Sequence, residues 1–465
     1  MNNQTSTQSV KDIILVLLCG VLLCYMAFVN YFPIVYPDCG TYIISGFTFK
    51  VPVDRPIFYG IFVREASLLI SLWLVIWMQG VLLALVVFYY FKYLSGTTKF
   101  RLYYILYIFI ITFFTAASFN VSQLIPDVFT PISILSMGLI LFASEMKKRD
   151  RDITALILVL SIAVHNSHLY ISILVLIMLT FLFIFRKFRE EMKVFSLKFK
   201  RIVNTWILLI ITYFMICTVN VTLGAGFAFS RGGHVFLMAR LIDMGIIDQY
   251  LNENCDKHHY NICQYKDKIP WDFIWDWENS PLYKFGYGWT SPQVKDEYNA
   301  IFRDVMTTPK YAHLFIVKSI ESTVKQFFCF SAGDAQCQEK GSPSYYAVST
   351  YYPSSTKEFL SSRQHGKTLD DVLSNNLQAY IFCISLFFCM FLFLYPRLAG
   401  KYKWIILFIL SGLLANAFIC GTFSLVLARY QTRVIWLLPL PLLLIMANRE
   451  VGVSTVRRFF NNTYV

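Results

Sequence analysis

The sequence predicts an all-α polytopic membrane protein with about ten transmembrane helices and one large insert outside the membrane. Three observations lead to this fold class. Of the 465 residues, 57% are hydrophobic and only 15% are charged, whereas about 25% of a soluble protein is charged. The apolar residues gather in runs that approach the ~20 residues needed to cross a bilayer. Basic residues are concentrated in alternate loops between these runs.

The order of the apolar runs defines the domain organisation. The long polar segment 224–377 separates the seventh run from the eighth, so the chain divides into an N-terminal transmembrane module (1–223), this insert (224–377) and C-terminal transmembrane helices (378–465). The runs lie near 12–32, 69–91, 102–119, 128–145, 152–165, 168–185, 204–223, 378–396, 403–421 and 433–447.

The distribution of Lys and Arg predicts the orientation. Basic clusters lie near 92–101, 147–151, 186–201 and 397–403, while the alternate loops 119–127 and 165–168 have no Lys or Arg. Because cytoplasmic loops carry the excess of positive charge, both termini are predicted to be cytoplasmic and the insert to lie outside. The net charge of +13 is therefore a topology signal, and we expect no nucleic-acid partner.

Four cysteines of the insert indicate its compartment. The motifs "CDKHHYNIC" (Cys255, Cys263) and "CFSAGDAQC" (Cys329, Cys337) have the same spacing, and two local disulfides are the simplest of three pairings. Disulfides imply an oxidising space such as a bacterial periplasm, and hence an inner-membrane protein. A zinc site that uses the two histidines of "CDKHHYNIC" is the alternative.

The first outer loop, residues 33–68, carries a candidate catalytic carboxylate. It contains "VYPDCGTYII", in which Asp38 follows the first span, and two short amphipathic stretches that are too polar to cross the membrane but could lie at its interface. Asp38 could also be the N-cap of the first stretch.

Two further outer turns contain polar residues. Asp127 in "IPDVFTP" is a second candidate acid, with a helix N-cap as the alternative interpretation. His165 and His168 in "AVHNSHLYI" can share one helical face and hold a phosphate or a metal, although polar groups at a bilayer edge need no function. Asp38, Asp127 and His165 together could hold one divalent ion.

Two outer segments could bind a phosphate. Arg231 and His234 flank two glycines in "FSRGGHVFLMARLID", where the alternative is a flexible hinge. Arg429 and Arg433 in "LARYQTRVIWLLPLP" lie outside against the positive-inside trend, which a lipid-linked phosphate or lipid headgroups would explain. The run "WDFIWDWENSPLY" could stack on sugar rings or form the core of the insert.

The topology, the "PDCGTY" motif in the first outer loop and the "RY" before a proline-containing last span resemble the GT-C glycosyltransferases. This class includes the protein O-mannosyltransferases and the aminoarabinose transferase of lipid A. The resemblance implies a GT-C-like fold with Asp38 as the essential acid and Asp127 as a second one. The Asp-Glu pair of the class is absent, because Cys39 follows Asp38.

The implied activity is an inverting transfer of a sugar from a polyprenyl-phosphate donor to a glycan, lipid or protein acceptor. The protein would also contact the lipids of the membrane in which it lies. Arg429, Arg433 and Arg231 would hold the phosphate, and Asp38 would take the acceptor proton. No nucleotide-binding glycine motif occurs, and a divalent metal is the one cofactor considered.

Two alternatives stay open. An O-antigen ligase or polymerase acting on a lipid-diphosphate glycan would suit "SRGGH" as well, although it would explain Asp38 less. A lipid or glycan transporter would place charged residues or broken helices near the middle of the membrane. The predicted spans have few such residues, and their polar groups gather at the outer edge.

Overall fold

The computed structural model describes residues 2–284, 288–332, 337–396 and 398–448, and this part of the chain is all-α, with 73% helix and no strand. The predicted all-α class is therefore confirmed. The last residues of the predicted C-terminal module, 449–465, lie outside the described residues.

Every predicted apolar run falls on a helix or on a pair of consecutive helices. The helices are α1 (Asn2–Leu23) with α2 (Tyr25–Asn30), α5 (Leu72–Leu94), α6 (Phe100–Phe114) with α7 (Ala117–Ser122), α8 (Phe129–Phe142), α9 (Lys148–Ala163), α10 (Asn166–Leu182), α12 (Phe199–Thr222), α20 (Val372–Leu394), α21 (Gly400–Phe423), and α22 (Ala428–Ile435) with α23 (Pro439–Ala447).

Length and composition allow fewer spans than predicted. Among the described residues, five segments are long and apolar enough to cross a membrane, namely α5, α12, α20, α21 and Ala428–Ala447. A sixth is present if α10 and residues Arg186–Phe195, which meet at 109°, form one broken span. The structure therefore has the helices of a multi-pass membrane protein, but about ten spans are not confirmed. Breaks explain the difference: α6 has 15 residues and covers only about 22 Å.

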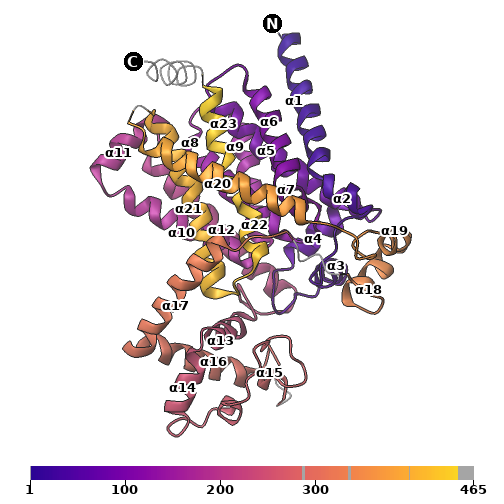
Figure 1. The fold of residues 1–465 in the computed structure, drawn as a ribbon, viewed down its shortest axis with the longest axis vertical. Helices are drawn as coiled ribbons and strands as arrows, with labels where there is room; N and C mark the ends of the chain where they lie inside the picture. Colours follow the sequence, from indigo (N-terminus) through magenta and orange to yellow (C-terminus); the bar gives the residue numbers. More distant parts are fainter. Residues whose placement is uncertain (1, 285–287, 333–336, 397, 449–465) are drawn as a thin grey trace.

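The basic loops gather at one end of the helical bundle. Arg101 pairs with Asp12 of α1 (2.7 Å), and Lys92 pairs with Asp150 (2.9 Å). At the same end, Trp404 donates to Glu191 of α11 (Arg186–Met192). Figure 1 shows the start of α1 and helix α11 at the end opposite the insert helices α13 to α16.

Helix α8 occupies the centre of the bundle. All of its residues are buried, and it contacts α5, α9, α10, α12, α21 and α22. Its position matters for the site, because the short 3-10 helix η1 (Pro126–Val128) immediately before it carries Asp127.

The two amphipathic stretches of the first outer loop form helices, as predicted. They are α3 (Cys39–Thr48) and α4 (Phe58–Ala66), and they cross where Gly46 meets Gly60. A Cβ atom on Gly46 would lie 2.1 Å from the Gly60 carbonyl oxygen, so the crossing requires glycine. This close contact fixes the loop that joins the two helices.

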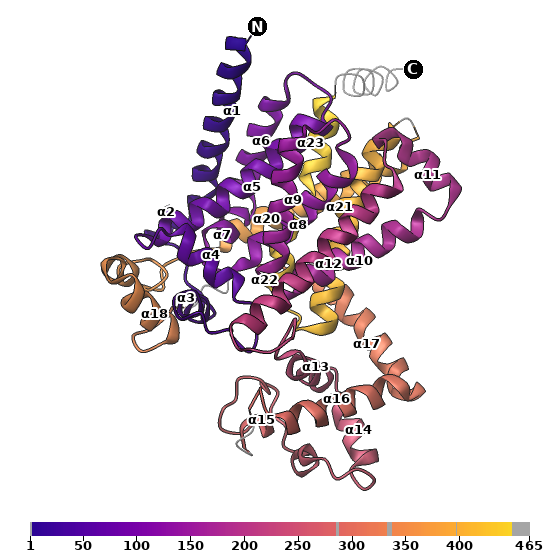
Figure 2. The same ribbon diagram turned by 180° about the vertical axis from the view of Figure 1, so that it is seen from behind.

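The insert has three differently packed parts. The first has its own hydrophobic core and comprises α13 (Gly233–Asp243), α14 (Ile246–Asn254), η3 (Asn261–Tyr265), α15 (Pro281–Lys284) and α16 (Pro292–Thr307). Helix α17 (Pro309–Phe328) runs back and packs on α21. Finally, α18 (Pro343–Tyr351), with η4 (Pro353–Ser355) and α19 (Thr356–Leu360), follows, and α18 packs on α3 (Figure 2).

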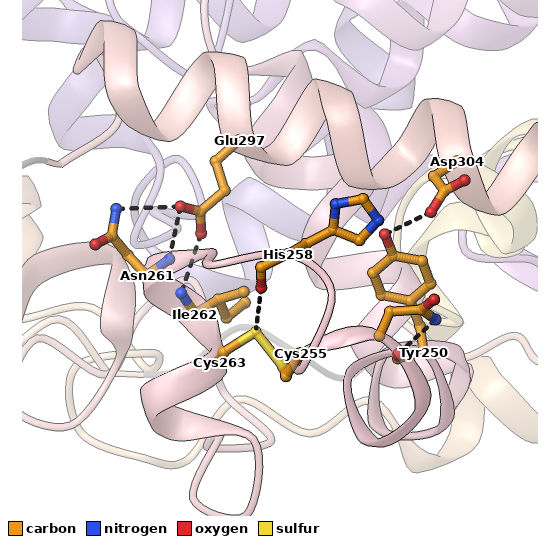
Figure 3. Close-up of a disulfide and its surroundings, with 9 residues drawn as sticks. Tyr250, Cys255, His258, Asn261, Ile262, Cys263, Glu297 and Asp304 are labelled. Carbon is orange, nitrogen blue, oxygen red and sulfur yellow. Dashed lines mark hydrogen bonds between the residues drawn. A yellow bond between two sulfur atoms is a disulfide. The ribbon is translucent and has the colours of Figure 1, made fainter.

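The structure contains the predicted disulfide between Cys255 and Cys263 (Figure 3). The Glu297 carboxylate accepts the N–H groups of Asn261 and Ile262 and so ties the disulfide loop to α16. The zinc alternative is wrong for these two thiols, because they are bonded to each other.

The second predicted disulfide, Cys329–Cys337, brackets residues 333–336, which lie outside the described residues, and it stays a prediction. The Cys337 sulfur lies 3.7 Å from His365 Nδ1.

Candidate functional site

Asp38 lies between two arginines. It precedes α3 at the N-cap position, but its side chain makes no capping hydrogen bond. Instead, Oδ1 accepts from Arg55 Nη2 at 3.0 Å and Oδ2 accepts from Arg429 Nη2 at 3.3 Å. The predicted N-cap position of Asp38 is confirmed, but its side chain does not cap the helix, and its carboxylate instead joins the first outer loop to α22.

The two guanidinium groups keep Asp38 ionised. Burial by itself raises the pKa of this carboxyl, but the opposite charges of Arg55 and then Arg429, with their hydrogen bonds, lower it to about 2. At neutral pH the site therefore holds a carboxylate whose two oxygens are both engaged by cations.

Arg55 is not among the residues that the sequence singles out. It lies in "PVDRP", where Pro52 and Pro56 restrict the loop between α3 and α4. Arg55 also pairs with Asp54 at 2.5 Å, and its guanidinium carbon is 4.8 Å from the centre of the Tyr42 ring. One signal could have found it: like Arg429 and Arg433, Arg55 is a cation in an outer segment against the positive-inside trend.

A second ion pair lies one helical turn away. Arg433 Nη1 donates to Asp127 Oδ1 at 2.7 Å, and both side chains are buried. Arg433 also donates to Asn416 Oδ1 at 2.9 Å. Asp127 is not the N-cap of α8, which is Val128, so the capping interpretation is wrong here as well. Since Arg429 and Arg433 are four residues apart on α22, this helix carries one partner of each pair.

The two histidines make structural hydrogen bonds. His165 Nδ1 accepts the N–H of Ser167 at 3.2 Å and so caps α10. His168 bonds Thr130 Oγ1 at 2.7 Å and the Ser161 carbonyl at 2.6 Å. A link to the ion pairs exists through Ser167, whose hydroxyl oxygen lies 3.5 Å from Arg433 Nη2.

A metal site is not formed by the residues suggested from the sequence. In the described part of the chain, no group of three or more His, Cys, Asp or Glu side chains could hold a metal ion. Asp38 and Asp127 are each paired with arginine. Burial, together with the charge of Arg433, lowers the pKa of His165 to about 3, which leaves its ring neutral.

Arg231 and His234 make their described contacts with residues other than those of the two ion pairs. Arg231 Nη1 donates to the Val51 carbonyl at 2.9 Å and so fastens the loop that carries Arg55. His234 is buried in the insert, 6.5 Å from the Tyr298 ring, and burial with the charge of Lys295 lowers its pKa. The sequence grouped these residues with the phosphate site, whereas in the structure Arg231 bonds a backbone carbonyl of the first outer loop and His234 is buried in the insert.

Three polar atoms of the site are buried without a hydrogen-bond partner among the described residues. They are Arg55 Nη1, Arg429 Nε and Asp127 Oδ2. A buried polar group without a partner costs free energy, so these atoms are suited to bind a ligand. Two of them are guanidinium N–H donors beside Asp38, and such donors fit the oxygens of an anion.

The aromatic run of the insert has two roles in packing. Phe273 and Ile274 belong to the core of the insert, but the Trp271 side chain is 90% exposed. Trp277 is also exposed and stacks on Tyr283 with ring centres 4.4 Å apart. The run therefore supplies core residues, as one interpretation predicted, and its exposed rings leave stacking on sugars a prediction.

Comparisons of the chain with protein-family models, with curated proteins and with solved structures found no match.

Proposed function

We propose that this protein is a membrane glycosyltransferase that moves a sugar from a polyprenyl-phosphate donor to an acceptor at the periplasmic face. One observation carries the proposal: the Asp38 carboxylate is held between Arg55 and Arg429, where the start of α3 meets α22. A carboxylate can take a proton from an acceptor hydroxyl, and two arginines can hold the phosphate that leaves the sugar.

The proposal includes a GT-C-like arrangement in the bacterial inner membrane. About ten membrane-embedded helices, some of them broken, would form the bundle, with both termini in the cytoplasm. The gathering of the basic loops at one end supports this orientation. The disulfide Cys255–Cys263 in the insert supports a periplasmic location for the other end.

The arginines would bind the donor phosphate. Arg55 Nη1 and Arg429 Nε have no hydrogen-bond partner among the described residues, so they can donate to phosphate oxygens without breaking an existing bond. As the bond between the phosphate oxygen and the anomeric carbon breaks, negative charge grows on that oxygen. Fixed guanidinium groups stabilise this charge in the transition state.

Donor binding would make Asp38 a stronger base. Burial alone raises the pKa of Asp38, and the arginines lower it to about 2. A phosphate that draws Arg429 and Arg55 toward itself weakens this effect, so the pKa of the carboxyl rises when the donor is present. The carboxylate then accepts the proton of the acceptor hydroxyl, whose oxygen attacks the anomeric carbon in a single inverting displacement.

Asp127 would act through Arg433. Its Oδ1 accepts from Arg433, which stands one turn from Arg429 on α22, so we assign Asp127 a positioning role. The ligase alternative, centred on Arg231 and His234, has less support, because Arg231 bonds a backbone carbonyl and His234 lies in the core of the insert.

The variant Asp38→Asn tests the proposal. Purified protein in vesicles is given a synthetic polyprenyl-phosphate sugar and a membrane-lipid extract from cells that lack the protein, and the transferred sugar is measured. We expect about 10²–10⁴-fold less transfer, because a positioned general base contributes this much. Asp12→Asn is the matched control, because it removes an ion-paired carboxylate at the other end of the bundle.

Thermal unfolding of each variant shows whether it is folded. Full transfer by Asp38→Asn would remove this residue from the site and would contradict the proposed mechanism. No transfer by the wild-type protein from any polyprenyl-phosphate sugar would contradict the proposed donor.

A further inference from the structure

Helix α17 buries its small and polar side chains. Ser319, Ser322, Thr323 and Gln326 recur at helical spacing on the face that packs against α21. The approach is close, since a Cβ atom on Gly421 would lie 2.8 Å from the Ser322 carbonyl oxygen. Small residues at such a crossing are typical of helices that associate inside a membrane.

The same helix exposes its large aliphatic side chains. Five side chains are between 45% and 62% exposed, namely Ile316, Val317, Ile320, Val324 and Phe328. Their spacing places them in one stripe along the helix. In a water-soluble domain the hydroxyl groups would face the solvent and the aliphatic groups would be buried, so α17 has the reverse pattern.

Charged side chains form a third row beside the stripe. Lys318 and Lys325 both pair with Glu321, at 3.1 Å and 2.7 Å. Lysines next to an apolar face can extend their ammonium groups to the polar side of a membrane interface while their methylene groups stay in the apolar region. Helix α17 therefore has one face for protein, one for hydrocarbon and one for water.

The neighbours of α17 are candidate membrane spans. Its buried face packs on α21, and Phe327 near its end lies 6.2 Å from Phe382 of α20. Most apolar side chains of α20 are exposed in the structure, as expected for a helix at the lipid-facing edge of the bundle. The stripe of α17 therefore adjoins a surface that lipid would cover.

We infer that α17 lies in the outer interface of the membrane, with the stripe from Ile316 to Phe328 in contact with lipid hydrocarbon. The insert is then not wholly outside the membrane, and this helix carries part of it back into the bilayer. Gln326 of α17 accepts the N–H of Leu427 (2.9 Å) and donates to its carbonyl (2.8 Å), immediately before α22. Helix α17 thereby sets Arg429, two residues further on, at the depth of the outer lipid headgroups.

Photo-crosslinking tests this inference independently of any activity. The photoreactive amino acid benzoylphenylalanine replaces Ile320, and the full-length protein is illuminated in vesicles of phosphatidylethanolamine and phosphatidylglycerol. Ile384, on the exposed side of α20, and the exposed Trp271 are replaced in the same way as positive and negative controls. We expect lipid adducts at positions 320 and 384 and none at 271, with mass spectrometry of the protein as the readout. Lipid adducts at 384 but not at 320, or adducts at 320 to a second copy of the chain, would overturn the inference.

A charge substitution provides a second test, because a new carboxylate should lower the thermal midpoint at a site in lipid hydrocarbon and leave it unchanged at a site in water. Ile320→Glu would bring a carboxylate into hydrocarbon and should lower the thermal midpoint in vesicles. Trp271→Glu, at an exposed site of the insert, should leave it almost unchanged. An Ile320→Glu variant that is as stable as Trp271→Glu would place the stripe in water and refute the inference.

Discussion

Single residues around the start of α3 and helix α22 carry charges that are compensated in pairs. Asp38 faces Arg55 and Arg429, and Asp127 faces Arg433. Removing charges from water is costly, and a pair repays that cost only with good geometry and additional hydrogen bonds. The extra bonds of Arg433 to Asn416 meet this requirement, whereas Arg55 and Arg429 retain unpartnered nitrogens. The pair of Asp127 and Arg433 therefore has more of its hydrogen bonds formed, although Asp127 Oδ2 has no partner among the described residues, and the group around Asp38 offers two free donors to a ligand.

The buried pair of Asp127 and Arg433 makes a testable contribution to stability. Asp127→Asn or Arg433→Met alone leaves one buried charge without its partner, which should destabilise the protein by about 3–5 kcal/mol. The double variant removes both charges, so its loss should be smaller than the sum of the two single losses. Thermal unfolding in lipid nanodiscs measures all four proteins. Strictly additive losses would show that the two charges do not stabilise each other.

His165 should make stability depend on pH. Its pKa falls from an ordinary 6.5 to about 3 in the folded protein, so between these values the unfolded chain binds one more proton than the native state. Stability is therefore lost as the pH falls below about 6.5. In His165→Asn the amide oxygen can still accept the Ser167 N–H, but the side chain no longer titrates.

We expect the thermal midpoint of the wild type to drop more between pH 7 and pH 5 than that of His165→Asn. Equal drops in the two proteins would mean that protonation of His165 does not destabilise the folded state.

At the scale of elements, two helix arrangements create the site. Helix α22 places Arg429 and Arg433 four residues apart, so both side chains project from the same face of the helix. This face contacts the first outer loop through Arg429 and η1 through Arg433. The crossing of α3 and α4 holds the loop that contains Arg55. Helix α18 holds α3 through Ser344, whose hydroxyl oxygen accepts the Gly40 N–H at 3.0 Å and donates to the Tyr36 carbonyl just before α3 at 2.7 Å. A part of the insert far along the chain thus supports the first outer loop.

The glycine crossing predicts a sharp difference between two alanine variants. Gly46→Ala brings a methyl group into the Gly60 backbone and should cost about 1–3 kcal/mol of stability through overpacking. Gly400→Ala, at the start of α21, meets nothing within 4 Å and should be neutral or slightly stabilising. Thermal midpoints compare the two. A Gly46→Ala variant as stable as Gly400→Ala would show that α3 and α4 separate without cost.

The whole molecule has its charges sorted by end. Ion pairs of Arg101 and Lys92 hold the basic loops at one end, and the Asp38 and Asp127 pairs lie at the other, next to the insert. Positive charge is retained on the cytoplasmic side during insertion, so this sorting predicts which end faces the cytoplasm.

Cysteine accessibility measures this orientation. Ser196 lies exposed in a basic loop, and Thr307 lies exposed at the end of α16 in the insert. In intact cells, a membrane-impermeant thiol reagent should label Thr307→Cys and should label Ser196→Cys only after the membrane is opened. The wild-type protein controls for its own thiols. Labelling of Ser196→Cys in intact cells would reverse the orientation and remove the site from the periplasmic face.

The sequence by itself determined the helices and the disulfide between Cys255 and Cys263. Long apolar runs can satisfy their backbone groups in lipid only as helices, and every run is helical in the structure. Cys255 and Cys263 are eight positions apart, so their disulfide depends on a short local loop. Asp38, Asp127, Arg429 and Arg433 were also found from the sequence, because charges at the outer edge of apolar runs are conspicuous.

Only the tertiary structure decided which of these charges meet. Asp38 and Arg429 are separated by 391 positions, and no local pattern relates them. The crossing of α3 and α4 holds the loop that carries Arg55, and Arg231 bonds a carbonyl of that loop 180 positions away, while His234 is buried in the insert. The length of each helix also depended on breaks such as the one after α6, so the apolar runs by themselves did not fix how many helices are long enough to cross a membrane. Apolar content is a local property of the chain, whereas the pairing of charges depends on where the packing of whole helices places their ends.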